Sequence, residues 1–202
     1  MSAPSALFAA IEAHDLDRLA VLLAEGSDPN VAKPTSPHWS PLHEAINELE
    51  DGGSIEALVL LLRYGAHVEG GGEDTPLLVA LYRAQPHAVS LLLAAGAQTN
   101  VRGPEGDTPL RVAVERGDHV TAATLLRCGA QATINDVGAP TGTSALGIAA
   151  MRLDVPMIEL LLQAGADPDA LDADHLTARG RLPSRTPENT QARDAAERLL
   201  GG

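Results

Sequence analysis

The sequence predicts an all-α solenoid, a fold in which short helix-turn-helix units stack one after another. Two observations support this prediction. Leucines recur at positions 7, 42, 77, 110 and 146, at separations of 35, 35, 33 and 36 residues, and a period of this length is typical of units built from two helices. Hydrophobic residues make up 45% of the chain but aromatic residues only 2%, which favours closely packed helices filled by Ala, Leu, Val and Ile.

Each expected unit begins with a signal for a helix N-terminus. Ser40-Pro41, Thr75-Pro76 and Thr108-Pro109 each combine a hydroxyl that can cap free amides with a proline suited to the first helical position. In the fifth unit, Ser144-Ala145 takes this place. A second apolar stripe then ends in a Gly-Ala pair, where glycine can end the helix in the left-handed conformation. The pairs begin at Gly65, Gly96, Gly129 and Gly165, and in the first unit Gly26 takes this place and is followed by Ser27.

The second unit is longer than the others. Leucine and glycine are 19 residues apart in four units, but Leu42 and Gly65 are 23 apart, and we interpret the extra residues around Leu49–Gly53 as a loop-like insertion. The long loops Val31–Pro37 and Ile134–Thr143 also break the even period. Such irregularities can carry binding specificity, or they can be neutral variation, because lengthening an exposed loop costs little free energy.

These signals divide a single domain, residues 1–202, into successive units. The units are expected at about 5–38, 39–72, 73–105, 106–141 and 142–175, with a C-terminal capping unit at 176–202. In the capping unit a second helix is expected over Glu188–Leu200. A solenoid needs atypical end units that cover its core, and Met1–Leu23 would do so at the other end.

The repeated pattern resembles that of the ankyrin repeat family. Ser40-Pro41-Leu42-His43-Glu44-Ala45 and Asp107-Thr108-Pro109-Leu110 carry the resemblance most clearly, together with the Gly-Ala pairs, and it extends from residue 5 to about 175. It implies an ankyrin-repeat solenoid with short β-hairpin or loop projections. The family's histidine is kept only as His43, where we expect a hydrogen bond near the helix start. We expect its replacements to weaken hydrogen bonding without changing the fold. These replacements are Phe8, Leu78, Arg111 and Gly147.

The resemblance implies a non-enzymatic scaffold that binds a partner protein through its concave face. Trp, Tyr, Arg and Met are enriched at binding hot spots. Trp39 could equally pack against its own loop, Pro34–Pro41, and solvated charges are common on helix surfaces. The positions that carry over to this face are Trp39, Asn47, Glu48, Asp74, Tyr82, Arg83, Arg102, Asp107, Glu115, Arg116, Thr143, Met151 and Arg152.

The net charge of −13 limits the class of partner. It argues against nucleic acid and anionic membranes and favours a protein with a basic patch. Two alternatives stay open. The chain could be a dedicated inhibitor or neutraliser of a bacterial enzyme or toxin, whose acidic face mimics a nucleic acid or phosphate. It could also be a secreted effector directed at a host.

No pattern indicates catalysis, a cofactor or a metal. The seven histidines include no pair four residues apart, and the acidic run Asp167–His175 lacks the spacing of a calcium loop. Gly70–Gly72 has no nearby lysine to help bind a phosphate. Cys128 is expected at a helix C-terminus, which disfavours a reactive thiolate. We therefore expect a protein without enzyme activity.

The cysteine count and the apolar runs bear on where in the cell the protein acts. One cysteine cannot form an internal disulfide, and neither a cleavable leader nor a membrane-spanning apolar run is apparent. We expect a cytoplasmic monomer. Lys33 is the only lysine among 14 basic residues, and with abundant alanine this favours a GC-rich bacterial genome as the source.

Overall fold

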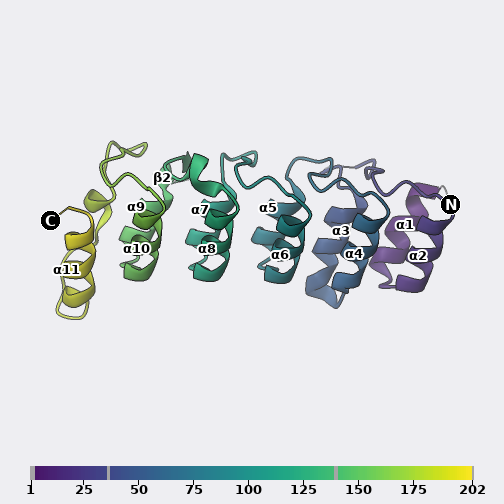
Figure 1. Ribbon diagram of the computed structural model, residues 1–202, viewed down its shortest axis with the longest axis horizontal. Helices are drawn as coiled ribbons and strands as arrows, with labels where there is room; N and C mark the ends of the chain where they lie inside the picture. The colour runs from purple at the N-terminus through teal and green to yellow at the C-terminus, as the bar shows by residue number, and fades with distance from the viewer. Residues whose placement is uncertain (1–2, 36, 139–140, 202) are drawn as a thin grey trace. The chain divides into compact units, whose positions relative to one another are not determined.

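The computed structural model describes residues 3–35, 37–138 and 141–201, and the chain divides into two compact units, Met1–Gln98 and Thr99–Gly202. Both units consist of antiparallel helix pairs joined by loops (Figure 1), which confirms the predicted all-α repeat fold. Parts of the long loops Val31–Pro37 and Ile134–Thr143 lie outside the described residues, namely residues 36, 139 and 140. Met1 and Ser2 of the expected N-terminal cap and Gly202 of the expected capping unit also lie outside the described residues.

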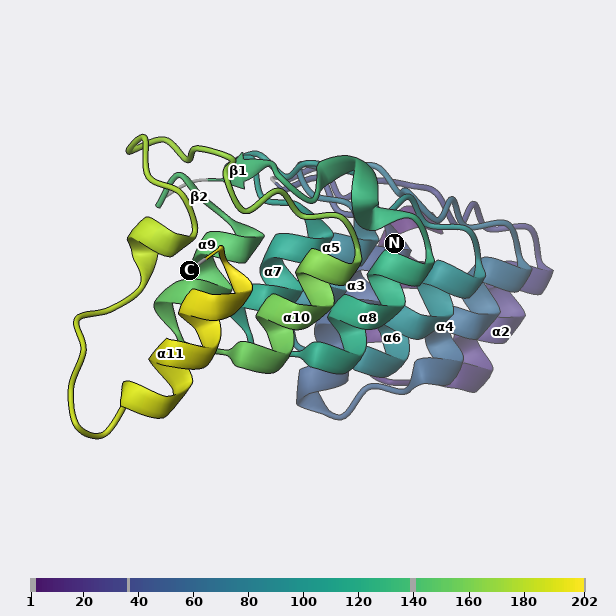
Figure 2. The ribbon, with the colours of Figure 1, turned by 60° about the vertical axis from the view of Figure 1, so that its left-hand side comes forward.

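The first unit contains three helix pairs. Its first helices α1, α3 and α5 pack consecutively against one another, and its second helices α2, α4 and α6 form another row (Figures 1 and 2). The elements are α1 (Ala3–Glu12), α2 (Leu16–Ala24), α3 (Pro41–Asn47), the 3₁₀ helix η1 (Glu48–Asp51), α4 (Ile55–Arg63), α5 (Pro76–Tyr82) and α6 (Pro86–Ala94).

The second unit contains two regular helix pairs and an irregular end. Helix α9 packs on α7, and the end elements η3 and α11 pack on α9 and α10. The elements are α7 (Pro109–Glu115), α8 (His119–Arg127), η2 (Ala130–Thr133), β1 (Val137–Gly138), β2 (Thr143–Ser144), α9 (Ala145–Met151), α10 (Val155–Gln163), η3 (Arg179–Arg181) and α11 (Thr190–Leu199). The two short strands pair antiparallel, Val137 with Ser144, so a small hairpin projects here. The C-terminal helix α11 is shorter than the expected Glu188–Leu200.

The repeat leucines form the centre of each core. Leu7, Leu42 and Leu77 in the first unit and Leu110 and Leu146 in the second are at most 1% exposed. Burying a leucine side chain stabilises a fold by roughly 2 kcal/mol, so the feature that reveals the period in the sequence also contributes much of the stability. Within the described residues, none of the helices has the length and apolar character needed to cross a bilayer.

The helix starts agree with the sequence. Thr75 accepts a hydrogen bond from the Leu78 amide at 3.4 Å, and Ser144 accepts one from the Gly147 amide at 3.1 Å. Ser40 and His43 form a capping box at the start of α3, in which His43 Nδ1 accepts the Ser40 amide at 3.2 Å. The Ser40 hydroxyl also lies 2.8 Å from this nitrogen, so it helps to orient the His43 ring.

The turns between the two helices of a repeat are tight in four repeats. The seventh residue after the repeat leucine adopts a left-handed φ in each: 54° at His14, 52° at Ala84, 70° at Gly117 and 54° at Leu153. This conformation costs a residue other than glycine about 1 kcal/mol, so three of the four turns hold some strain.

In the second repeat the connection between the two helices has a different structure. The extra residues do not form a loop, as we had expected, but the 3₁₀ helix η1, which continues directly from α3. It ends at Gly52, whose φ is +97°. At Gly53 a Cβ atom would lie 2.7 Å from the Glu48 carbonyl oxygen, so this close approach requires glycine.

Polar side chains connect each loop to the next one. Asn30 donates to the Gly65 carbonyl at 3.0 Å and accepts from the His67 amide at 2.7 Å. In the second unit, Asn100 donates to the Gly129 carbonyl at 2.8 Å. Each asparagine therefore ties its loop to the next Gly-Ala turn of the same unit.

Candidate functional site

The sequence places candidate binding residues at the last turn of each first helix. We use the term first-helix face for the fifth and sixth positions after the repeat leucine. In the first unit these are Asn47, Glu48, Tyr82 and Arg83, and in the second unit Glu115, Arg116, Met151 and Arg152. Helices α3 and α5 pack together, as do α7 and α9, so each unit brings its own four residues to neighbouring helices.

In the first unit the first-helix face combines an aromatic ring with ion pairs. Tyr82 is 38% exposed, whereas Asn47 is half-buried. Glu48 lies 3.1 Å from His14, and Arg83 donates to Glu50 at 3.0 Å. Exposed pairs of this kind contribute at most about 1 kcal/mol. They therefore position the charged groups around Tyr82 more than they stabilise the fold.

In the second unit the first-helix face is more open. Met151 is 47% exposed, and Glu115, Arg116 and Arg152 are also exposed. Arg102 lies in the preceding loop and pairs with Asp136. This unit therefore presents a flexible apolar side chain next to exposed charges.

Trp39 and Asp74 lie in the loops above the first helices rather than on the face. The Trp39 ring is half-buried and stacks on His43, with centroids 6.2 Å apart and planes 10° from parallel. Its indole N–H is buried without an acceptor in the described part of the chain. The structure thus shows Trp39 packed against its own repeat, and the carbonyl of Asp74 serves as a partner for His43.

His43 joins two successive loops through both ring nitrogens. Nδ1 accepts the Ser40 amide at 3.2 Å, which leaves the proton on Nε2, and Nε2 donates to the Asp74 carbonyl at 2.9 Å. Burial lowers the pKa of His43, and this outweighs the opposing effect of the Asp74 carbonyl. The expected hydrogen bond near the helix start is therefore present, and it uses the neutral ring.

Arg111 occupies the same register position in the fourth repeat and corrects one expectation. Its replacement of histidine was expected to weaken hydrogen bonding, but Arg111 is 1% exposed and donates to the Thr143 carbonyl at 3.2 Å and to Thr141 Oγ1 at 3.2 Å. It also pairs with Asp107 and, at 3.6 Å, with Glu115. A guanidinium has five N–H donors, so this replacement adds contacts.

Thr143 was expected among the partner-binding residues, and its burial argues against that role. It is 1% exposed because its backbone lies in β2 and its carbonyl accepts from Arg111. A partner cannot reach a side chain in this position. Asp107 is only 13% exposed at its side chain and serves mainly as the counterion of Arg111.

Lys33 is a residue that the sequence did not single out. Its ammonium lies 2.8 Å from Glu44 and 3.0 Å from Glu12, and 5.1 Å from the centre of the Phe8 ring. Burial opposes the charge, but the two carboxylates outweigh it and raise the pKa of Lys33. Its position in a loop of ordinary composition gave no signal of this role.

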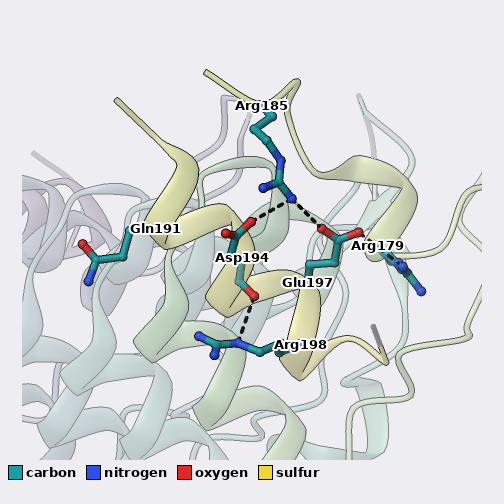
Figure 3. A pocket seen from close by; sticks show the side chains of 6 residues that line it. All are labelled: Arg179, Arg185, Gln191, Asp194, Glu197 and Arg198. Carbon is teal, nitrogen blue, oxygen red and sulfur yellow. Dashed lines mark hydrogen bonds and ion pairs between the residues drawn. The ribbon is translucent and has the colours of Figure 1, made fainter. Parts of the chain in front are cut away.

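The end of the second unit contains a hollow of about 550 Å³ with a charged lining (Figure 3). Arg185 lies 2.7 Å from Asp194 and 3.4 Å from Glu197, and Arg179 lies 3.2 Å from Glu197. The hydrogen bond from Arg179 lowers the pKa of Glu197. The ion pairs neutralise Arg179, Arg185, Asp194 and Glu197 and stabilise the capping unit. Arg198, which also lines the hollow, donates to the backbone carbonyl of Asp194 at 3.2 Å.

The histidines, the cysteine and the acidic residues do not form a metal site in the described part of the chain. In residues 3–35, 37–138 and 141–201, no three His, Cys, Asp or Glu side chains come together as metal ligands would. In the acidic run, Asp172 accepts hydrogen bonds from the Asp174 and Leu176 amides and from Arg181. The acidic run is thus used to build the turn into the capping unit.

Comparison with known proteins gives a family and a fold. A family model described as ankyrin repeats, in three copies, matches residues 50–136 and 77–172. A search of curated proteins finds no match.

Two solved structures are similar over nearly the whole chain. One is a chain of the complex between the Bd0816 predatory endopeptidase from Bdellovibrio bacteriovorus and immunity protein Bd3460. It is 24% identical, with a TM-score of 0.73 and 96% of each chain covered. The other is the ankyrin repeat protein EF0377, which is 21% identical with a TM-score of 0.76, covering 98% of this chain and 96% of the other. At these identities the likeness concerns the fold.

Proposed function

The chain belongs to the ankyrin repeat family, and on that premise we propose that it is a non-enzymatic scaffold which holds a partner protein on the first-helix face. Ankyrin repeats bind protein partners. The finer proposal is that the contact runs through the last turns of the first helices, and that the protein acts in the cytoplasm.

The exposure of Tyr82 and Met151 carries this proposal. Both occupy the fifth position after the repeat leucine, and both are large side chains left 38% and 47% exposed. Packing does not require an apolar residue at an exposed position of a helix. Tyrosine can anchor a contact at low entropic cost, and methionine adapts to an irregular partner surface.

The surroundings of these two residues support the same role. Glu48 is held by a hydrogen bond with His14 and Arg83 by an ion pair with Glu50, so these side chains are ordered before a partner arrives. A preorganised surface loses less entropy on binding. The net charge of −13 favours a partner with a basic patch and would speed their encounter.

The alternative function is that of a dedicated inhibitor or neutraliser of a bacterial enzyme. One structural neighbour is a chain of a complex between a predatory endopeptidase and an immunity protein, so a protein of this fold occurs in such a complex. The acidity of the first unit supports it, with 4 basic and 13 acidic residues in 1–98 and a charge of 4 − 13 = −9. A secreted, host-directed effector is the third proposal, and export assays test it.

The experiment isolates a partner and then measures its affinity. The wild-type protein is used to capture a partner from the lysate of the source cell, and the purified partner is titrated against Tyr82→Ala, Met151→Ala and a control, Val120→Ala. Val120 is 79% exposed on the second helix α8, so the control removes an exposed apolar side chain away from the first-helix face.

We expect each of the two face variants to weaken binding about tenfold, which corresponds to 1.4 kcal/mol, and the control to bind as the wild type does. Equal binding by all four proteins would show that the partner uses another surface. Loss of a partner enzyme's activity on binding would select the inhibitor alternative.

A further inference from the structure

A second surface with apolar character lies in the first unit, on the row of second helices. Leu49 from the insertion, Ile55 and Val59 from α4, and His87 and Leu91 from α6 line an open groove of about 570 Å³. Val59 is 37% exposed. This groove is formed by residues that the first-helix face does not use.

The groove has the geometry of a seat for a helix. Ile55 and Val59 are four residues apart on one wall, and His87 and Leu91 are four apart on the other. Side chains spaced in this way form ridges along a helix, and the ridges of a third helix can pack between them. An amphipathic helix with its own apolar residues at i and i+4 is the occupant that matches two such rows.

Equivalent positions elsewhere are smaller or more polar. Between α2 and α4 the corresponding residues are Leu16 and Ala20 on one wall and Glu56 and Leu60 on the other, so a smaller residue replaces Val59 and an acid replaces His87. In the second unit the corresponding position on α8 is His119, which pairs with Asp154 at 2.8 Å. The wall of two β-branched residues, Ile55 and Val59, is therefore specific to the junction of the second and third repeats.

The insertion closes one end of the groove. Because η1 continues from α3 and turns at Gly52, Leu49 and Gly53 reach the start of α4 and line the groove there. The tight turns of the other repeats have no residues to place at this position. The insertion that lengthens the second repeat thus lies at the groove between α4 and α6.

The charge around this end is negative. Asp51 in η1 lies in sequence between the lining residues Leu49 and Gly53, is exposed, and forms no ion pair within the part of the chain that the structure describes. Glu50 is partly compensated by Arg83. Since the whole first unit has a charge of 4 − 13 = −9, a matching occupant is basic where it meets the insertion.

We infer that this groove is a second binding surface, which takes a basic amphipathic helix of a partner protein. The apolar stripe of the helix packs between Ile55–Val59 and His87–Leu91, and its basic residues lie beside Asp51. The inference goes beyond the first-helix face, since it concerns the other row of helices and an occupant of defined secondary structure.

A synthetic peptide of leucine and lysine tests the inference on the full chain. The probe has about 18 residues, or five turns, with leucines at i, i+3, i+4 and i+7 so that they form one stripe. A scrambled peptide of the same composition has the same charge but no stripe. NMR methyl signals map the contact, and fluorescence titration gives the affinity for wild type, Val59→Asp, Asp51→Asn, Val120→Asp and Tyr82→Ala.

We expect the probe to shift the methyl signals of Ile55, Val59 and Leu91 and to bind at least tenfold more tightly than the scrambled peptide. Val59→Asp should weaken binding at least tenfold, and Asp51→Asn about twofold with a smaller salt dependence. Val120→Asp and Tyr82→Ala should leave it unchanged, so failure of the first-helix face and failure of the groove give different results.

Three outcomes would overturn the inference. Equal affinity for the scrambled peptide would mean that charge alone attracts the probe. Methyl shifts confined to the first-helix face would place the contact there. Sedimentation showing a dimer of the protein alone, dissolved by Val59→Asp, would assign the groove to a second copy of this chain.

Discussion

His43 and Arg111 perform the same task in the two units with opposite electrostatics. Each is the residue after its repeat leucine, each is almost completely buried, and each donates to the carbonyl just before the next repeat's helix, Asp74 at 2.9 Å or Thr143 at 3.2 Å. His43 does so as a neutral ring. Arg111 is a buried cation, and it requires the carboxylate of Asp107.

The comparison shows that a neutral and a charged donor can serve the same register position, which the third repeat fills with Leu78 and no side-chain donor. A neutral donor makes the first unit sensitive to protonation, and a charged donor makes the second unit sensitive to the loss of its counterion. Four changes test this difference, in order of decreasing expected effect.

Arg111→Leu should have the largest effect. Leucine already occupies this position in the third repeat, where Leu78 is 0% exposed, so its size is compatible with the site. The change leaves the Asp107 carboxylate and the Thr143 carbonyl without their donor. We expect a loss of about 3 kcal/mol in the free energy of unfolding, measured by urea denaturation with circular dichroism.

A matched double variant separates charge from packing. Arg111→Leu/Asp107→Asn should recover part of the loss, because it also removes the negative charge that the Arg111 guanidinium compensates. Arg127→Leu, at an exposed arginine of α8, should change stability by no more than about 0.5 kcal/mol. No recovery in the double variant would mean that packing, rather than charge, is the main function of Arg111.

Asp172→Asn should have the second-largest effect on stability. It tests another buried ion pair of the second unit, between Asp172 and Arg181. Asp172 is 3% exposed at its side chain and accepts from Arg181 Nε at 2.6 Å. The hydrogen bond from Arg181 is the largest cause of its lowered pKa. We expect a loss of about 2 kcal/mol, measured by thermal and urea unfolding at pH 7.

The same residue predicts a dependence on acid. Because the folded pKa lies below the unfolded value of 3.8, its stabilisation is complete above that value and is lost as the pH falls through the folded pKa. The difference in stability between wild type and Asp172→Asn should therefore shrink below pH 4. A constant difference from pH 7 to pH 3 would contradict this account.

His43→Leu should have a smaller effect at neutral pH, about 1.5 kcal/mol, because two hydrogen bonds are lost from a buried site. The pH dependence is more informative. Since burial lowers the folded pKa of His43 below the usual 6.5, the neutral ring contributes fully above pH 6.5, and this contribution is lost as the pH falls below it.

The melting temperature of the wild type should thus fall more than that of His43→Leu between pH 7.5 and 5.5. His67→Leu removes an exposed histidine and serves as the control, with the slope of the wild type. If the two variants have the same slope, His43 does not supply the protonation sensitivity of the first unit.

The smallest effects come from one turn position shared by both units. Ala84 and Gly117 are each the seventh residue after the repeat leucine, with φ of 52° and 70°. Ala84→Gly should stabilise the protein by about 0.5 kcal/mol, and Gly117→Ala should destabilise it by about 1 kcal/mol. A Cβ at Gly117 would meet nothing within 4 Å, so the effect is conformational. Effects of the same sign in urea titrations would refute this interpretation.

Much of the fold could be predicted because its signals are local. Period, capping hydroxyls and Gly-Ala ends each act within a few residues, and α5 and α7 begin at Pro76 and Pro109 as expected. The candidate site was less predictable. Exposure of Tyr82 and Met151 follows from helical register, but burial of Thr143 depends on Arg111, which lies 32 residues away.

The sequence by itself determined the repeat, the family and the register of the first helices, because these depend on apolar spacing and helix ends. Only the tertiary structure decided how the irregular positions are used. It gave the insertion a helical form beside the α4–α6 groove, set Lys33 between Glu12 and Glu44, and made Arg111 a buried tie. The physical reason is that a charged side chain takes its role from partners a whole repeat away, and those distances exist only once the helices have packed.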